Sequence, residues 1–382
     1  MTDVDGKKYL NDLEPVQFAP LPEDPLVSIL ICSFNLEKYI GRTIESALNQ
    51  TYKNIEVIIC DDGSSDNSWD VVQRYAKADA RVKIFRKENG GQASTLNRTF
   101  QESSGSVVSV LDADDLFAPF KVRMVIDKFR ENPETGFIIH PIMLVDTKGA
   151  AIQPAPLIDN FEEGWIAERV IRRGGRFRSM PASTISFRRE LGKFIFPIHG
   201  RMFTPDGYIC TLLPLFTPIG VVRKIAADYT MHDTNTSSLI RDFSTREKGL
   251  NTTVKYLKQL EEIINAINDR TEQLGLKHLR IDINDNLDYR IRQFSLELLQ
   301  DKDRRSLFDG FRRLVPLLNR DTLFSPLQRL IFFSVYLVMI PMPIGMRTWC
   351  VGRLHPPNKL KFKILKFFGR TGNFRKGYGK AA

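Results

Sequence analysis

The chain has 382 residues, a mass of 43.8 kDa and a formal net charge of +10. Its contents of 42% hydrophobic and 26% charged residues are ordinary for globular proteins and exclude a wholly disordered or fibrous chain. The charge is uneven: residues 302–382 hold 17 Lys and Arg against 3 Asp, a net +14, which leaves −4 (10 − 14) for the rest. This length allows two or three domains, with the basic character confined to the C-terminal part.

Residues 1–25 are rich in proline and acidic side chains and predict a loose leader. Short apolar segments, typical of strands buried on both faces, then alternate with segments of helical periodicity. The expected strands are Val27–Cys32, Ile55–Cys60, Val82–Phe85 and Val107–Leu111. This alternation predicts an α/β fold with a doubly wound, mostly parallel sheet, whose ligand lies beyond the C-terminal strand ends.

The pattern changes after about residue 135. Residues Phe137–Val145 predict one further strand, and Ile158–Phe187 predict loops with a helix. Apolar residues recur near a 3.6-residue period between about 244 and 300, which predicts helices. We therefore expect a leader (1–25), an α/β domain (26–240), a helical region (241–322) and an apolar, basic tail (323–382).

Polar residues follow three of the predicted strands. Ser33-Phe34-Asn35 follows the first strand, Asp61-Asp62 the second, and Asp112-Ala113-Asp114 the fourth. In extended backbone, the side chains of Asp112 and Asp114 point the same way, and two adjacent carboxylates repel each other unless a cation lies nearby. Mg2+ and Mn2+ often bind one or two carboxylates together with substrate phosphates, so a metal–diphosphate site is predicted at this edge. The alternative is an ordinary solvated turn.

Three sequence stretches together resemble the nucleotide-sugar-binding half of family 2 glycosyltransferases of GT-A fold. They are VSILICSFNLEKYIGRTIESALNQTYKNIEVIICDDGSSDNS, NGGQASTLN and GSVVSVLDADD, and the similarity is continuous over residues 26–116. The resemblance implies a UDP-sugar donor whose uracil lies among Cys32, Phe34 and Asp62, beside Asn35. It further implies that Gly91, Gln92 and Asn97 pack under the nucleotide, that Asp112 faces the ribose, and that Asp114 binds Mn2+ or Mg2+ at the diphosphate. Family members often have an arginine where this chain has Leu96.

The acceptor half, residues 117–240, should supply a base and close the site. The resemblance implies an acidic residue before an apolar helix, and Asp206 fits, although Pro205 stands where the family usually has Glu. A carboxylate here would remove the proton of an acceptor hydroxyl; alternatively, Asp206 is an ordinary residue at a helix N-terminus. The stretch Tyr229–Ser237 resembles the segment that closes such domains and implies that His232 reaches the metal or the diphosphate. A structural role for His232 is the alternative.

These residues imply a direct displacement that inverts the anomeric centre. The acceptor would be a glycan or a lipid-linked molecule, in surface polysaccharide biosynthesis. A non-catalytic scaffold of the same fold remains an alternative, which Leu96 and Pro205 keep open. A nucleotidyltransferase is disfavoured, because SFNLEKY follows the first strand in place of a Gly-rich loop with a basic residue.

The C-terminal part combines apolar and basic segments. Leu330–Met346 has no charge but is interrupted by Pro341 and Pro343, so only Leu330–Ile340 is expected to be one helix. In Leu360–Phe368, lysines alternate with large apolar residues, a composition that suits an anionic membrane surface. Nucleic-acid binding or a solvated tail are the alternatives, and we expect the membrane rather than nucleic acid.

The expected location follows from cysteines and the N-terminus. The four cysteines are far apart and lack metal-finger spacing, which favours a reducing compartment, and the polar N-terminus does not resemble a signal peptide. We therefore expect a cytoplasmic protein, peripheral on the inner face of the plasma membrane.

Overall fold

The computed structural model separates the chain into two units. Unit 1 comprises Met1–Asp233 and Glu261–Asp282, and unit 2 comprises Thr234–Leu260 and Ile283–Ala382. The structure describes residues 13–154, 161–177, 180–202, 204–232, 235, 245–300, 302–320 and 326–354.

Unit 1 is built on a seven-stranded mixed sheet. In spatial order its strands are β10 (Ile219–Val221), β6 (Phe137–Ile139), β9 (Ser186–Arg188), β4 (Val107–Asp112), β1 (Val27–Ser33), β2 (Ile55–Asp61) and β3 (Val82–Arg86). The neighbours β4, β1, β2 and β3 run parallel, as predicted, and each expected strand lies within the observed one. Only β9 runs antiparallel to its neighbours β4 and β6, so the sheet is mostly parallel.

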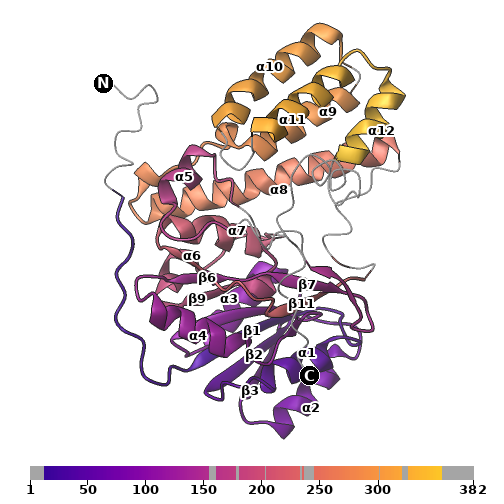
Figure 1. The fold of residues 1–382 in the computed structure, drawn as a ribbon. Helices are drawn as coiled ribbons and strands as arrows, with labels where there is room; N and C mark the ends of the chain where they lie inside the picture. The colour runs from indigo at the N-terminus through magenta and orange to yellow at the C-terminus, as the bar shows by residue number, and fades with distance from the viewer. Residues whose placement is uncertain are drawn as a thin grey trace. The chain divides into compact units, whose positions relative to one another are not determined.

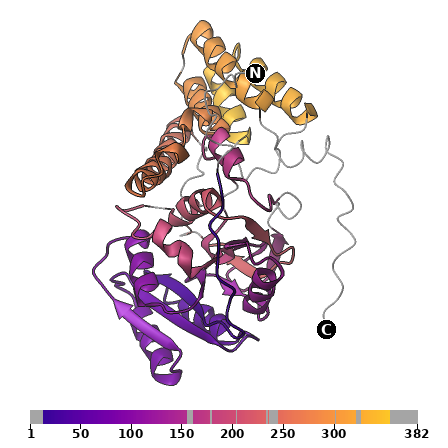
Figure 2. The same cartoon turned by 90° about the vertical axis from the view of Figure 1, so that its left-hand side faces the viewer.

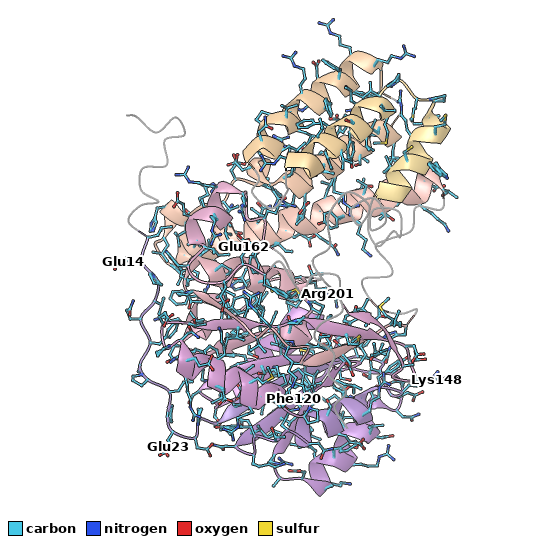
Figure 3. The ribbon with its side chains drawn as sticks, in the orientation of Figure 1. Glu14, Glu23, Phe120, Lys148, Glu162 and Arg201 are labelled. Atoms are coloured by element: carbon cyan, nitrogen blue, oxygen red, sulfur yellow. The ribbon has the colours of Figure 1, made fainter. Side chains whose placement is uncertain are left out.

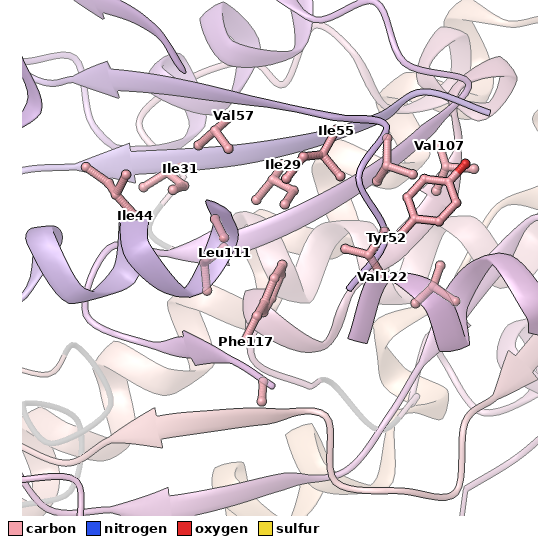
Figure 4. Close-up of a cluster of buried hydrophobic side chains, with 14 of the residues drawn as sticks. Ile29, Ile31, Ile44, Tyr52, Ile55, Val57, Val107, Leu111, Phe117 and Val122 are labelled. Carbon is pink, nitrogen blue, oxygen red and sulfur yellow. The ribbon is translucent and has the colours of Figure 1, made fainter. Parts of the chain in front are cut away.

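Helices cover both faces of this sheet (Figures 1 and 2). The helices that follow the first strands are α1 (Ile40–Leu48), α2 (Ser68–Ala78), α3 (Gln92–Glu102) and α4 (Lys121–Glu131). On one face, alternate strand residues such as Ile29, Ile31 and Val57 pack against α1 and α4 in a core whose buried residues are 0 to 6% exposed (Figure 4). Helix α3 packs on β1 and β2. Burial of each such isoleucine contributes about 1.5–3 kcal/mol, so this core fixes the strands whose ends carry the site.

The segment Phe137–Val145 is two strands, not the single strand predicted. Residues up to Ile139 form β6, whereas Ile142–Val145 form β7 of a second, four-stranded sheet. That sheet has the order β5 (Leu116–Phe117), β11 (Ala227–Thr230), β7 and β8 (Ala151–Pro154). Pro141 between the two strands has no backbone N–H and a fixed φ, so the chain leaves the first sheet there.

Short helices connect the remaining strands of unit 1. Helix α5 (Ala167–Arg172) lies in the segment predicted as loops with a helix, and α6 (Gly192–Ile195) and α7 (Pro205–Leu212) follow β9.

The long helix α8 (Arg246–Gln273) and helix α9 (Leu287–Leu299) confirm the helical prediction for residues 244–300.

Unit 2 is helical in its described residues. Helices α9, α10 (Arg304–Arg320), α11 (Pro326–Met339) and α12 (Ile344–Leu354) enclose a core that includes Phe294, Leu314 and Tyr336. Helix α11 contains most of the predicted Leu330–Ile340 helix and ends two residues before Pro341. None of the helices in the described part of the chain is both long and apolar enough to cross a membrane. The basic segment Leu360–Phe368 lies outside the described residues.

Candidate functional site

The polar residues predicted at the strand ends lie together. In the parallel register, Cys32 at the end of β1 lies opposite Cys60 on β2 and opposite Asp112 on β4. Ser33 lies opposite Asp61. The three strand ends therefore form one continuous sheet edge, as the sequence predicted.

The end of β1 forms the floor of this edge. Burial raises the pKa of the Cys32 thiol well above its ordinary value, and the neighbouring Cys60, Asp112 and Asp62 raise it further, so the thiol is neutral. Phe34 is 46% exposed, so the surface of its ring is available to a ligand. Asn35 has a left-handed φ of 53°, and its Oδ1 accepts a hydrogen bond from the Ser65 backbone N–H at 2.8 Å. Its side chain thus supports the turn that presents Phe34.

Asp62 holds the loop that precedes α3. Its carboxylate accepts hydrogen bonds from the backbone N–H groups of Gly90 (3.0 Å) and Gly91 (2.8 Å) and from the ammonium group of Lys87. Gly91 has a φ of +85°, a conformation that other residues rarely adopt. The carboxylate is 4% exposed, so these three donors compensate the loss of water.

Helix α3 carries three further residues singled out by the sequence. Gln92 donates from Nε2 to Asp112 Oδ1 at 3.2 Å, which places it at the sheet edge. Asn97 instead bonds the backbone of Ile198 through both ends of its amide, each at 2.8 Å. Leu96 is 2% exposed and packs in the interior. Arg201, labelled in Figure 3, donates to the Asn89 backbone oxygen at 2.8 Å, so the segment leading to α7 is joined to this region.

The acidic stretch after β4 is a turn, not the extended backbone assumed from the sequence. Asp112 is the last residue of β4, and the Asp115 N–H donates back to the Asp112 carbonyl at 3.1 Å. Asp115 is fully buried and accepts from the Ser183 hydroxyl (2.6 Å) and the Thr230 N–H (3.0 Å). Asp115 therefore stabilises the turn, whereas the carboxylates of Asp112 and Asp114 are the ones that could contact a ligand.

Asp114 is paired with His232. The distance from His232 Nε2 to Asp114 Oδ2 is 2.9 Å, and the imidazole stacks on the Tyr39 ring at a centroid distance of 4.7 Å. These two residues are separated by 118 positions in the sequence, and the structure brings together the two predicted metal ligands.

Asp206 lies in the first turn of α7, one residue after Pro205. Burial raises the pKa of its carboxyl to about 6, although the backbone N–H groups of Gly207 and Asp206 act in the opposite direction. Burial also raises the pKa of Asp112 well above its ordinary value, and the negative charges of Asp114 and Asp206 raise it further. The negative charge of Asp206 therefore acts on Asp112 at the sheet edge.

A divalent cation fits the Asp114–His232 pair. Among the described residues there is no group of three or more His, Cys, Asp or Glu side chains that could hold a metal without other ligands. A carboxylate suits Mn2+ or Mg2+ when diphosphate oxygens and water complete the shell. A neutral imidazole nitrogen can serve as a further metal ligand. Adjacent ligands of an ion at 2.0–2.1 Å stand roughly 3 Å apart, close to the observed 2.9 Å.

Several residues around the site were not predicted. They are Tyr39, Arg42 and Thr43 beside Asp114 and His232, Lys87 beside Asp62, and Ser183 beside Asp115. Tyr39, Arg42 and Thr43 stand at helical spacing directly after the first strand end, which is the one signal that could have indicated them.

Comparison with known proteins identifies the family. Residues 28–194 match the model of glycosyl transferase family 2. An uncharacterized glycosyltransferase of Nostoc sp. is 29% identical over 267 residues, which cover 69% of this chain and 81% of that protein. The chondroitin synthase of Escherichia coli is 36% identical over 139 residues, which cover 36% of this chain but only 20% of the synthase. Most of the synthase therefore lies outside this alignment.

Among solved structures, residues 1–349 of S. aureus TarS in complex with UDP-GlcNAc align at a TM-score of 0.45 and 16% identity, covering 76% of this chain and 88% of that one. A likeness at this level says nothing about the donor or metal of this chain. The family match, the strand-end residues and the mostly parallel sheet agree, and residues 28–194 form a glycosyl transferase family 2 domain of GT-A fold.

Proposed function

We propose that this glycosyltransferase is metal-dependent and inverting, and that it moves a sugar from a UDP-sugar to a hydroxyl of a glycan or lipid-linked acceptor. The observation that carries the proposal is the pairing of Asp114 with His232, at 2.9 Å, at the sheet edge where Asp112 ends β4. Asp206 of α7 supports it, because the charge of Asp206 contributes to the raised pKa of Asp112. A transfer needs such groups together, because the leaving group and the attacking hydroxyl meet at one carbon.

The donor half, residues 26–116, binds the nucleotide. The uracil lies over Cys32 and Phe34, and its N–H donates to Asp62. A carboxylate has about four acceptor positions, and three are used by Gly90, Gly91 and Lys87, so one remains for the base. Asp112, oriented by Gln92, accepts from the ribose. The other predicted residues support the nucleotide site. Asn35 stabilises the turn that carries Phe34, Gly91 packs under the nucleotide, and Asn97 forms hydrogen bonds with the backbone of Ile198.

Asp114 and His232 would hold Mn2+ or Mg2+ beside the diphosphate. When bound, the ion supplies Lewis-acid chemistry and neutralises negative charge on the departing diphosphate. The Asp114 carboxylate gives the charged oxygen ligand, and His232 gives a nitrogen whose direction is fixed by the stack on Tyr39.

Asp206 acts as the general base. Its carboxylate takes the proton of the acceptor hydroxyl while that oxygen forms a bond to the anomeric carbon and the carbon–phosphate-oxygen bond breaks. Attack from the side opposite the leaving group inverts the anomeric centre, so an α-linked donor gives a β-glycoside. The raised pKa of about 6 suits a base that works near neutral pH.

A thermal-shift screen of nucleotide sugars with and without Mn2+ tests this function. A ligand that binds only the folded chain stabilises it by mass action, by about 2.7 kcal/mol at a concentration 100 times its Kd. We expect UDP and one or more UDP-sugars to raise the melting temperature, and Mn2+ to increase the rise. An equal or larger rise with GDP-sugars, or no response to any nucleotide, would contradict the proposed donor.

We also propose that unit 2 attaches the enzyme to an anionic membrane surface, where a lipid-linked acceptor would be presented. Leu330, Leu337 and Val338 of α11 are 45 to 62% exposed, and Leu337 and Val338 follow Leu330 by seven and eight positions, so the three lie on one face of the helix. Met346 and Trp349 of α12 are 54% and 59% exposed. An apolar face with Trp, in a region of net charge +14, suits the interface of a bilayer with anionic lipids.

Replacement of Leu337 and Val338 by Glu should weaken vesicle binding, because two carboxylates would meet both the apolar layer and the anionic headgroups. The measurement is co-flotation with phosphatidylcholine vesicles that contain or lack phosphatidylglycerol. Ile152→Glu is the matched control, because Ile152 is 55% exposed on β8 of unit 1. Flotation that is equal for the double variant and the parent chain would contradict this attachment.

A further inference from the structure

The first turn of α1 contacts both of the segments that carry the proposed metal ligands. Tyr39 precedes the helix, and Arg42 and Thr43 follow three and four positions later, so the three side chains share one face. We call this face the α1 platform (Tyr39, Arg42 and Thr43).

Thr43 holds the turn that carries Asp114. Its side chain is fully buried, and its hydroxyl lies 3.0 Å from the Ala113 carbonyl oxygen and 2.9 Å from the Asp115 carbonyl oxygen. These carbonyls belong to the residues on either side of Asp114. The single hydroxyl proton is donated to one of these carbonyls or shared between them, which restricts the backbone of Asp114.

Tyr39 and Arg42 hold the segment that carries His232. The Tyr39 and His232 rings are nearly parallel, with an interplanar angle of 16°. Arg42 donates to the Thr230 hydroxyl at 3.0 Å and to the Thr147 carbonyl at 3.1 Å, and its guanidinium carbon lies 5.2 Å from the Tyr39 ring centre. Arg42 thus fixes the end of β11, two residues before His232, and also contacts the ring on which His232 stacks.

We propose that the α1 platform positions Asp114 and His232 as a pair of divalent-cation ligands, so that Tyr39, Arg42 and Thr43 are positioning residues of this enzyme. Asp114 lies in a turn, and His232 follows the last strand, so neither is fixed by a helix or a strand of its own. Contacts from one rigid helix restrict Asp114 and His232 before the ion binds, so less conformational entropy is lost on binding. This inference rests on the proposed metal site.

The test is the affinity of the full chain for Mn2+ in the presence of UDP, measured by the loss of the free Mn2+ signal in electron paramagnetic resonance. Tyr39→Leu removes the stack, and Thr43→Val removes the hydroxyl at nearly constant volume. Each is expected to weaken Mn2+ binding about 10- to 100-fold. Tyr39→Phe and Thr43→Ser keep the ring and the hydroxyl, respectively, and should stay within about twofold of the parent chain. Uridine affinity should not change in any of the four variants.

Tyr75→Leu is the matched control, because Tyr75 also packs on α1 but donates its hydroxyl to Glu45, away from the acidic turn. Mn2+ affinity within twofold of the parent in both Tyr39→Leu and Thr43→Val would overturn the inference. So would an equal loss of Mn2+ and uridine binding, which would indicate a general disturbance of the fold. A parent chain that binds UDP but no Mn2+ would overturn the proposed metal site, and the platform with it.

Discussion

Asp206→Asn is expected to lower kcat by about 10²- to 10⁴-fold, because the amide cannot take the proton of the acceptor hydroxyl. The affinity for UDP should change little, since Asp206 lies in α7 and none of the proposed nucleotide contacts involves it. The two quantities are measured separately, kcat by release of UDP with acceptor present and affinity by titration calorimetry. A selective loss of kcat would assign Asp206 to the chemical step.

The pH dependence of the parent enzyme gives an independent measurement of the same residue. A base works only when it is deprotonated, and burial raises the pKa of Asp206 to about 6. The rate should therefore rise tenfold per pH unit below about 6 and level off above it. This acidic limb should be missing from the residual rate of Asp206→Asn.

The stability of Asp206→Asn distinguishes a chemical role of Asp206 from a structural one. A carboxyl whose pKa is higher in the folded chain than in the unfolded chain destabilises the fold once it ionises. Asp206→Asn should consequently be no less stable than the parent at pH 8. Asp70→Asn is the control, because Asp70 also lies in the first turn of a helix, α2, but is exposed and is not one of the proposed site residues. An unchanged kcat in Asp206→Asn would favour another base, and absence of turnover in the parent would favour the scaffold alternative.

The part of the fold that could be predicted is the part governed by local pattern. Three of the four strands, Val27–Cys32, Ile55–Cys60 and Val107–Leu111, are mostly apolar and buried on both faces, and this pattern needs no knowledge of distant residues. Their parallel alternation with helices also fixes which ends meet, so the strand-end residues could be placed together. The segment Phe137–Val145 is equally apolar, but its division between two sheets depends on β9 and β11, which lie far along the chain.

The site divides in the same way. Asp62, Asp112 and Asp114 could be proposed as site residues because strand ends carry them, and His232 and Asp206 because of the family resemblance. The roles of the neighbouring side chains could not be predicted, because they depend on tertiary contacts. Asp115 stands in the same acidic run as Asp114, and only its burial against Ser183 and Thr230 shows that it holds the turn. Asn97 likewise bonds Ile198, 101 residues away.

Mutations should distinguish two roles among the carboxylates that follow β4, one in stability and one in metal binding. Asp115→Asn replaces a buried oxygen that accepts a hydrogen bond with an NH2 group that cannot accept one, so a lower melting temperature is expected. Asp114→Asn keeps an oxygen at the site but removes the negative charge that a divalent ion requires. Its melting temperature without ligand should stay close to that of the parent.

Asp114→Asn is expected to lower Mn2+-dependent transfer by roughly 10³-fold, which corresponds to about 4 kcal/mol of transition-state stabilisation at 1.36 kcal/mol per tenfold. Addition of Mn2+ should no longer raise the melting temperature in the presence of UDP, whereas uridine should still bind through Cys32, Phe34 and Asp62. Asp146→Asn is the matched control, because the Asp146 carboxylate also lies in a turn, where it accepts from the Lys148 and Ala150 N–H groups. Transfer by Asp114→Asn within tenfold of the parent at saturating Mn2+ would mean that this carboxylate is not the charged ligand. Asp112 would then be the next residue to replace, since its oxygen already accepts from Gln92 at the same edge.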